Sequence, residues 1–204
     1  QTADGGYLIS GTSLIKTDAY GNEEWRYDDL YSGYAIQTND GGYALLYSIL
    51  AEQRIVLDKR NTDGSLNWST TYSCSASTTF ASKLRKTSEG GFIICATTNQ
   101  DTGFGLDAWI IKTDILGNIE WEHHYGGLYM DEAHDVQQTT DGGYIFTGVT
   151  WDDSPERNND IWVVKIDAQG TVQWDYNYDY DFPNFTYSIE QTSDNGFVVG
   201  GSKY

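Results

Sequence analysis

Two sequence motifs recur along the whole chain. The first, QTADGGY at residues 1–7, appears again in related form starting at residues 37, 86, 138 and 191. The second, KxDxxGxxxW, lies between successive copies of the first, at residues 16–25, 59–68, 112–121 and 165–174. Two independent motifs that share one period of about 50 residues indicate a repeat protein, in which each unit stacks on its neighbours to build the core.

Each repeat is expected to form four short β-strands and no long helix. Around the fourth repeat, four segments rich in β-branched and aromatic residues are bounded by Gly, Asp and Asn: 143–150, 160–167, 171–178 and 187–193. The DGG triplet predicts a tight hairpin turn in which Asp and Gly occupy two positive-φ positions. The DxxG motif predicts a second, slightly longer hairpin, in which Asp accepts amide hydrogen bonds and Gly is left-handed.

This pattern predicts an all-β fold, a β-propeller built of four-stranded antiparallel blades, with about four full repeats and a partial fifth. The expected repeats, in one domain, span residues 1–36, 37–85, 86–137, 138–190 and, for the partial fifth, 191–204. The residues expected to hold the repeat together are those of the second turn and the Trp that follows it at an equivalent place on each blade: Asp18, Gly21, Trp25, Gly64, Trp68, Asp114, Gly117, Trp121, Asp167, Gly170 and Trp174. In the second repeat, Asn61 replaces the turn Asp.

The two motifs together resemble the extracellular β-propeller repeats of bacteria and archaea, and the resemblance covers the entire chain. The GxxxW portion is also similar to the tryptophan-docking repeat of pyrroloquinoline-quinone propellers, and TDxxGxxxW to the Asp-box of sialidase-type propellers. The chain departs from both in its spacing from Asp to Gly, which removes support for the chemistry of either enzyme family. The resemblance implies a secreted or surface-anchored protein, and therefore an extracellular or cell-surface location.

The charge of the chain excludes several classes of partner. Thirty acidic and 12 basic residues give a net charge of −18, which opposes binding to nucleic acid or to an anionic membrane surface. No apolar run approaches the ~18 residues of a membrane span, so no membrane insertion is expected. The 7 Trp, 16 Tyr and 7 Phe residues supply large apolar groups that a disordered acidic segment lacks.

Both tight turns are expected on one face of the propeller and the unequal loops on the other, which is usually the ligand face. The candidate ligand-binding residues combine carboxylates with aromatic rings in the loops of the third and fourth repeats: Tyr129, Asp131, Trp151, Asp152, Asp153, Asp160, Asp179 and Tyr180. Oxygen ligands of this kind suit Ca²⁺, and exposed rings suit sugars. The alternative is a solvated acidic loop, which the composition alone would produce.

The sequence shows no catalytic constellation. The turn aspartates recur once per repeat, whereas a glycosidase needs two carboxylates around one bond. His134 is expected on an inner strand, where it either packs structurally or lines the central channel. Cys74 and Cys95 either form a disulfide between adjacent blades, or Cys95 is a small buried residue.

Three functions remain open from the sequence. The first is a non-enzymatic binding or structural module with a glycan or protein partner and no cofactor other than Ca²⁺. The second is a carbohydrate-active hydrolase or lyase that uses acids such as Asp152, Asp153 and Asp181. The third is self-association, in which the partial repeat at 191–204 completes a neighbouring ring or filament. The two ends of the chain share one phase of the repeat, so we expect a processed or partial chain.

Overall fold

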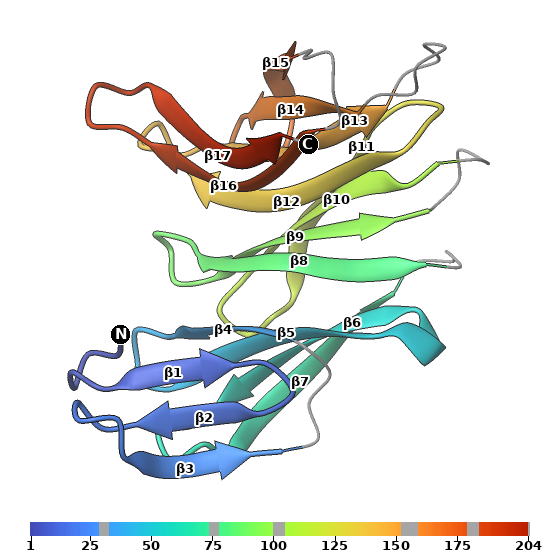
Figure 1. Ribbon diagram of the computed structural model, residues 1–204. Helices are drawn as coiled ribbons and strands as arrows, with labels where there is room; N and C mark the ends of the chain where they lie inside the picture. Colours follow the sequence, from blue (N-terminus) through green and yellow to red (C-terminus); the bar gives the residue numbers. More distant parts are fainter. Residues whose placement is uncertain (29–32, 74–77, 100–104, 152–158, 179–183, 204) are drawn as a thin grey trace.

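The computed structural model describes residues 1–28, 33–73, 78–99, 105–151, 159–178 and 184–203. Within this part of the chain, all regular structure is β except one 3₁₀ turn, η1, at Leu50–Glu52. The strands form five antiparallel sheets, and within each sheet the strands neighbour one another in chain order. Figure 1 shows the sheets stacked in an arc that does not close, with the first and the last sheet at its two ends. The fold is the predicted all-β propeller architecture with four-stranded blades.

Three sheets have four strands each. The second sheet contains β4 (Gly33–Gln37), β5 (Tyr43–Ile49), β6 (Arg54–Arg60) and β7 (Leu66–Ser73). The third sheet contains β8 (Thr79–Lys86), β9 (Phe92–Thr98), β10 (Asp107–Thr113) and β11 (Ile119–Tyr125). The fourth sheet contains β12 (Asp131–Gln138), β13 (Tyr144–Trp151), β14 (Asn159–Ile166) and β15 (Val172–Tyr178).

The two end sheets have fewer strands. The first sheet contains β1 (Tyr7–Ser10), β2 (Leu14–Thr17) and β3 (Glu23–Tyr27), and the fifth contains β16 (Asn184–Gln191) and β17 (Phe197–Lys203). The sequence repeat is offset from the sheet by one strand. The repeat at 37–85, for example, holds β5, β6, β7 and most of β8, so each repeat supplies three strands to one sheet and the inner strand of the next.

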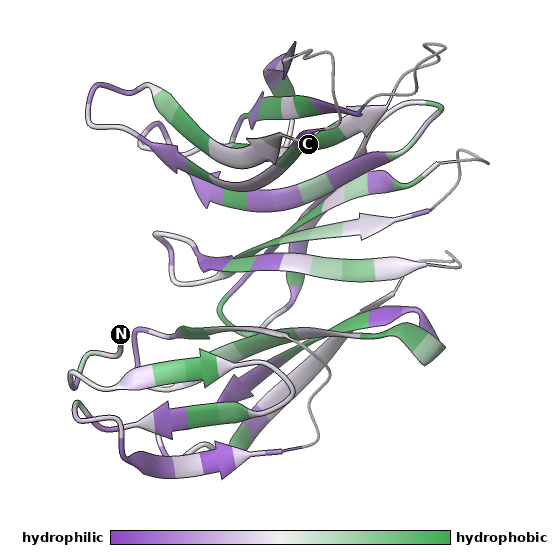
Figure 2. Ribbon diagram, viewed as in Figure 1, coloured by the Kyte–Doolittle hydropathy of each residue, from purple (hydrophilic) through white to green (hydrophobic). Residues whose placement is uncertain are grey.

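The inner strands β4, β8, β12 and β16 follow one another along the inside of the arc, where each contacts the next. The outer strands β3, β7, β11 and β15 expose most of their side chains at the rim. In Figure 2, the outer strand β3 is drawn largely in the hydrophilic colours, as expected for a strand that faces solvent. The apolar residues therefore concentrate on the second and third strands of each sheet, which pack against the neighbouring sheets.

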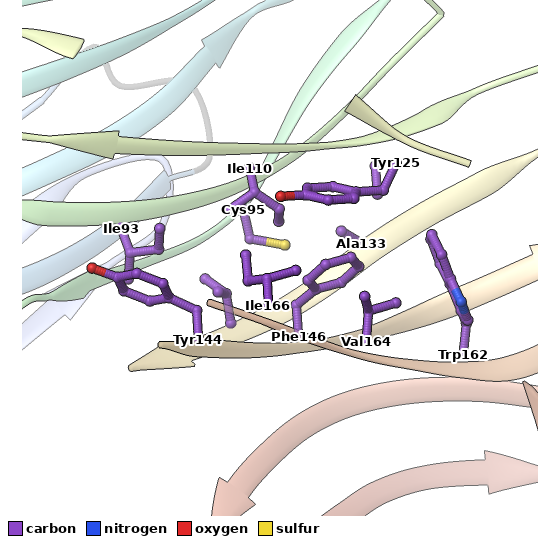
Figure 3. Close-up of a cluster of buried hydrophobic side chains, with 12 residues drawn as sticks. Ile93, Cys95, Ile110, Tyr125, Ala133, Tyr144, Phe146, Trp162, Val164 and Ile166 are labelled. Carbon is purple, nitrogen blue, oxygen red and sulfur yellow. The ribbon is translucent and has the colours of Figure 1, made fainter. Parts of the chain in front are cut away.

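The core lies between sheets. Its largest cluster joins β9, β10 and β11 of the third sheet to β12, β13 and β14 of the fourth, and Figure 3 shows the rings of Tyr125 and Phe146 facing one another within it. The Cys95 thiol is free and fully buried in the same cluster. Cys95 is therefore the small buried residue that one of the two alternatives from the sequence predicts. Cys74 lies outside the described residues.

The DGG turn differs from its predicted geometry. In the second sheet, Gly41 N donates to Thr38 O at 3.1 Å and Thr38 N to Gly42 O at 2.9 Å, and Gly41 has a φ of 81°. Asp40 does not have a positive φ, so the prediction of a primed turn with two positive-φ residues is wrong. The geometry is a three-residue loop that ends on one left-handed glycine. Asp40 instead accepts from Gly42 N, at 3.1 Å, and caps the turn.

The second glycine of DGG is needed for close approach of the third strand. A Cβ on Gly42 would lie 2.3 Å from Arg60 O and 2.5 Å from Lys59 Nζ. The buried Lys59 ammonium pairs with Asp40 at 2.8 Å, so the lysine of the second motif binds the aspartate of the first. The same contact joins Lys16 to Asp4 at 2.8 Å and Lys165 to Asp141 at 3.0 Å. This link between the two motifs was not predicted from the sequence.

The DxxG turn is capped by its aspartate. Asp18 Oδ1 accepts from Tyr20 N at 2.8 Å and from Asn22 N at 2.9 Å, and Gly21 has a φ of 88°. The hydrogen bond from the Asn22 side chain is the main cause of a lowered Asp18 pKa. Where Asn61 replaces the aspartate, Asp63 takes over and accepts from Ser65 N at 3.0 Å.

The four tryptophans of the second motif occupy corresponding places between sheets. Each half-buried indole packs against the aromatic residue that follows the first turn of the next sheet. The ring centroids are 5.2 Å apart for Trp25 and Tyr43, 6.4 Å for Trp68 and Phe92, 5.6 Å for Trp121 and Tyr144, and 5.9 Å for Trp174 and Phe197. The tryptophan thus ties each sheet to its successor.

Acid is expected to weaken the lysine–aspartate links. The pKa of Asp40 is lowered to about 2, mainly by the hydrogen bond from Lys59, and that of Asp141 to about 2, mainly by the hydrogen bond from Thr139. An unfolded aspartate titrates near about 3.9, so this stabilisation is complete above about pH 4 and is lost as the pH falls towards 2. Urea unfolding between pH 5 and 2 should show a shallower pH dependence for the double variant Asp40→Asn/Asp141→Asn. If the wild-type protein and the double variant lost stability equally with falling pH, the lysine–aspartate pairs would not be the cause of the acid sensitivity.

Candidate functional site

Three of the inner strands carry a β-bulge at the same place. The pairing register shifts once in β8, β12 and β16, and the unpaired residue is Ser82, His134 and Tyr187 respectively. A bulge re-aims the side chain of its extra residue. The partner strand is close at this point, because a Cβ on Gly148 would lie 1.6 Å from Glu132 O. The repeated bulge therefore turns one side chain per sheet towards the inside of the arc.

The bulged residues line a common pocket of about 290 Å³. We call it the channel-mouth pocket, and its lining residues are Tyr34, Ala81, Ser82, His134, Phe185, Thr186 and Tyr187. Three of its aromatic rings are accessible, since Tyr34 is 42%, Phe185 37% and Tyr187 60% exposed. The residues come from the early part of the inner strands, away from the DGG turns, so the pocket lies towards the loop side of the arc.

His134 is held by polar contacts within this pocket. Its Nδ1 lies 2.8 Å from Thr186 O, which can only accept, so Nδ1 donates to this carbonyl. Its Nε2 lies 3.2 Å from Glu132 Oε2. The imidazole therefore joins β12 to β16 and places a carboxylate beside the pocket. The ring has the structural role that one alternative predicted, and it also lines the channel-mouth pocket.

An ion cluster lies further along the inner strands. The fully buried Asp135 carboxylate accepts from Arg85 Nη2 at 2.8 Å, Arg85 Nε at 3.2 Å and Ile189 N at 3.1 Å, while Arg85 Nη1 donates to Glu190 at 3.0 Å. These contacts connect β8, β12 and β16. Arg85 also lines a second pocket of about 390 Å³ with Ile36, Lys86, Gln137 and Gln138. We call Arg85, Asp135 and Glu190 the inner-strand ion cluster.

The structure brings part of the predicted loop site together. Tyr129 is 43% exposed, and Trp151, half-buried at the end of β13, donates its backbone N–H to Met130 O at 3.0 Å. Asp131 on β12 and Asp160 on β14 lie opposite Thr150 of β13 in the strand register, one on each side of it. The other predicted ligand residues, Asp152, Asp153, Asp179 and Tyr180, lie outside the described residues, as does Asp181.

Asp131 is buried rather than presented at the surface. It is 3% exposed and accepts from Gly127 N at 2.6 Å. A Cβ on Gly126 would lie 2.7 Å from Asp131 Oδ2 and 2.7 Å from Asp107 Oδ1, so the two carboxylates flank this glycine. Burial raises the pKa of Asp131, and the charge of Asp107 adds to the effect. Among the described residues, no three His, Cys, Asp or Glu side chains group as metal ligands, and Ca²⁺ binding stays a prediction.

Four residues of the channel-mouth pocket were not predicted from the sequence: Tyr34, Ser82, Phe185 and Tyr187. A signal for some of them was present in the repeat, because Ser82, His134 and Tyr187 each precede the threonine of the first motif by five residues. An alignment of the repeats on that threonine puts the three residues at the same position of successive inner strands. The bulge that exposes them had no signature of its own in the sequence.

In the part of the chain that the structure describes, no helix has the length and apolar character needed to cross a membrane.

No protein-family model and no curated protein matches this chain. Among solved structures, it is similar to hydrazine synthase of Kuenenia stuttgartiensis, with a TM-score of 0.59 and 13% identity over 96% of this chain and 52% of that one. It is also similar to an endo-1,4-beta-xylanase from Bacteroides thetaiotaomicron, with a TM-score of 0.53 and 11% identity over 98% and 94% of the two chains. BamB from Moraxella catarrhalis matches with a TM-score of 0.40 and 10% identity over 99% and 86%. At these identities the likeness concerns the fold alone, and the chain is a β-propeller module whose described sheets form an open arc.

Proposed function

We propose that this β-propeller module is a binding module that recognises a glycan at the channel-mouth pocket. One observation carries the proposal: three inner strands bulge at the same level and direct Ser82, His134 and Tyr187 into one pocket. A structural role alone would not require three successive sheets to present different polar side chains at a shared opening. Bulges of this kind occur next to functional sites.

The chemistry of the pocket suits a sugar. The exposed rings of Tyr34, Phe185 and Tyr187 supply flat apolar faces, while Ser82 and Glu132 supply hydrogen-bond partners for hydroxyl groups. The volume of about 290 Å³ is near the lower limit for a small-ligand site, which favours one terminal sugar unit over a long chain. The net charge of −18 and the nearby Glu132 favour a neutral sugar over an acidic one.

The location of the module is part of the proposal. Its two repeat motifs resemble those of extracellular bacterial and archaeal propellers, and this resemblance supports a role in a secreted or surface-anchored protein. The open side of the pocket lies towards the unequal loops, which can add specificity to the small central site. Of the aromatic residues predicted for that outer region, the structure describes Tyr129 and Trp151.

Calorimetric titration with a panel of neutral and acidic oligosaccharides tests the proposal. The panel includes xylo-oligosaccharides, because one protein of similar fold is named as an endo-1,4-beta-xylanase. We expect a neutral sugar to bind, and Tyr187→Ala to weaken its binding at least about tenfold through the loss of one stacking face. Tyr20→Ala is the control, since this side chain is 92% exposed in a turn on the opposite face.

Three results would overturn this proposal. Unchanged affinity in both Tyr34→Ala and Tyr187→Ala would place the sugar outside the channel-mouth pocket. Binding by no member of the panel would leave a protein partner as the remaining ligand class. The third is the release of shorter sugars from the panel, abolished by Asp152→Ala or Asp181→Ala, which would establish the hydrolase or lyase alternative instead.

A further inference from the structure

The loop between β11 and β12, residues 126–130, is held against both the third and the fourth sheet. At its end, Asp131 N donates to Leu106 O, just ahead of β10, at 2.6 Å. On the side of the fourth sheet, Trp151 N donates to Met130 O at 3.0 Å. Both sheets have a described sheet on either side of them. The loop therefore lies at an interface inside the chain, and its position is set by contacts with two sheets.

Two buried carboxylates lie at the base of this loop, and we call them the carboxylate pair. Asp107 and Asp131 are each 3% exposed. A Cβ on Gly126 would lie 2.7 Å from Asp107 Oδ1 and 2.7 Å from Asp131 Oδ2, so the two oxygens border the same small space. Asp131 also accepts from Gly127 N at 2.6 Å and from Thr150 Oγ1. Two carboxyl groups held this close, away from water, disfavour the state in which both are charged.

The titratable groups around the pair do not offset its negative charge. They are Tyr129 in the loop, Glu132 on β12 and Asp160 on β14, which lies opposite Thr150 in the strand register. Within the described residues, no ion pair to Asp131 occurs. Burial raises the pKa of Asp131, and the charge of the other carboxylate of the pair adds to this effect. The surroundings thus favour a state in which the pair keeps one proton.

We infer that the carboxylate pair is a pH-dependent clasp for the loop at residues 126–130. While the pair holds one proton, the carboxyl group of one residue donates to the carboxylate of the other, and the loop stays against both sheets. When both groups ionise, two negative charges share a buried space, and the loop separates from the sheets. The loop carries three exposed apolar side chains, Leu128, Tyr129 and Met130. Ionisation therefore changes how this apolar segment is presented on the loop side of the arc.

The clasp is expected to hold more firmly in acid. A carboxyl group whose pKa is higher in the folded protein than in the unfolded chain stabilises the fold fully below about pH 4, near the ordinary aspartate value. This contribution is lost as the pH rises through the higher, folded value. The lysine–aspartate links behave in the opposite way and are complete above about pH 4. Measurements from pH 4 to pH 8 therefore separate the clasp from those links.

Amide hydrogen exchange tests the clasp at three backbone N–H groups whose hydrogen bonds hold the loop: those of Gly127, Asp131 and Trp151. In the wild-type protein, their protection, corrected for the intrinsic pH dependence of exchange, should fall at least about tenfold between pH 4 and pH 8, the factor that corresponds to one unit of pKa. In Asp131→Asn, the amide cannot ionise and still donates to Asp107. Protection in this variant should stay high at both pH values.

Two further variants serve as a confirmation and a control. Asp107→Asn places the amide on the other side of the pair and should give the same pH-independent protection. Glu132→Gln makes the same change one residue along β12, outside the pair, and should keep the wild-type pH dependence.

Three results would overturn the inference. The first is equal protection of the wild-type loop at pH 4 and pH 8. The second is a loss of protection in Asp131→Asn, which would show that the ionised carboxylate holds the loop. The third is high wild-type protection at pH 8 that a chelator removes, which would assign the pair to a bound cation. None of these measurements needs a sugar, so their outcome is independent of the glycan proposal.

Discussion

Replacing Asp135 with alanine is expected to lower the free energy of unfolding by about 3–5 kcal/mol, because it removes the buried carboxylate of an ion pair that joins three strands. The Asp135 side chain is 0% exposed and accepts hydrogen bonds from Arg85 on β8 and from Ile189 N on β16. Its removal leaves Arg85 with only the exposed Glu190 as a carboxylate partner and leaves the buried Ile189 N–H without its acceptor. It also removes one link between the inner strands of three sheets. Urea denaturation of the full chain measures the loss.

Glu190→Gln is the matched control for this prediction. Glu190 contacts the same arginine, at 3.0 Å, but its side chain is 59% exposed. Water screens such a pair, so its loss should cost at most about 1 kcal/mol. If the two variants were destabilised equally, burial of Asp135 would not be the source of the effect, and the inner-strand ion cluster would be no more than a surface network.

Trp121→Ala is expected to destabilise the protein by about 3 kcal/mol, the lower end of the range for such a truncation because the indole is half-buried. The variant loses the edge-on contact with Tyr144 at 5.6 Å and the hydrogen bond to Ala168 O at 2.9 Å. Both partners belong to the fourth sheet, so the third and fourth sheets should separate more easily. Hydrogen exchange of β10–β14 would locate the loss at that interface.

Asn61→Ala serves as the comparison for the tryptophan. Asn61 lies in an exposed turn where Asp63 already caps the backbone, accepting from Ser65 N at 3.0 Å. We expect a change within about 0.5 kcal/mol, as for surface sites away from special features. A loss at Asn61 similar to that at Trp121 would show that the turn, rather than the interface between sheets, carries the stability of the repeat.

The sequence alone determined the features that depend on neighbouring residues. The motif spacing predicted the four-stranded sheets, because hairpin turns are set by a few local residues such as Asp18 and Gly21. It also placed the tryptophans at equivalent positions, since a constant register after the turn puts Trp25 and Trp68 on the same face of each outer strand. The repeat thus gave the architecture without any knowledge of contacts between sheets.

Tertiary structure decided the rest, because the remaining features join residues far apart in the chain. The second glycine of DGG is needed because Arg60 O approaches within 2.3 Å of where a Gly42 Cβ would lie, and no local rule for turns predicts that approach. Likewise, His134 and Tyr187 reach the channel-mouth pocket because inner-strand bulges redirect them, and Asp135 finds Arg85 on another sheet. Such contacts depend on how closely strands pack against one another, and the sequence pattern of a single strand does not specify that packing.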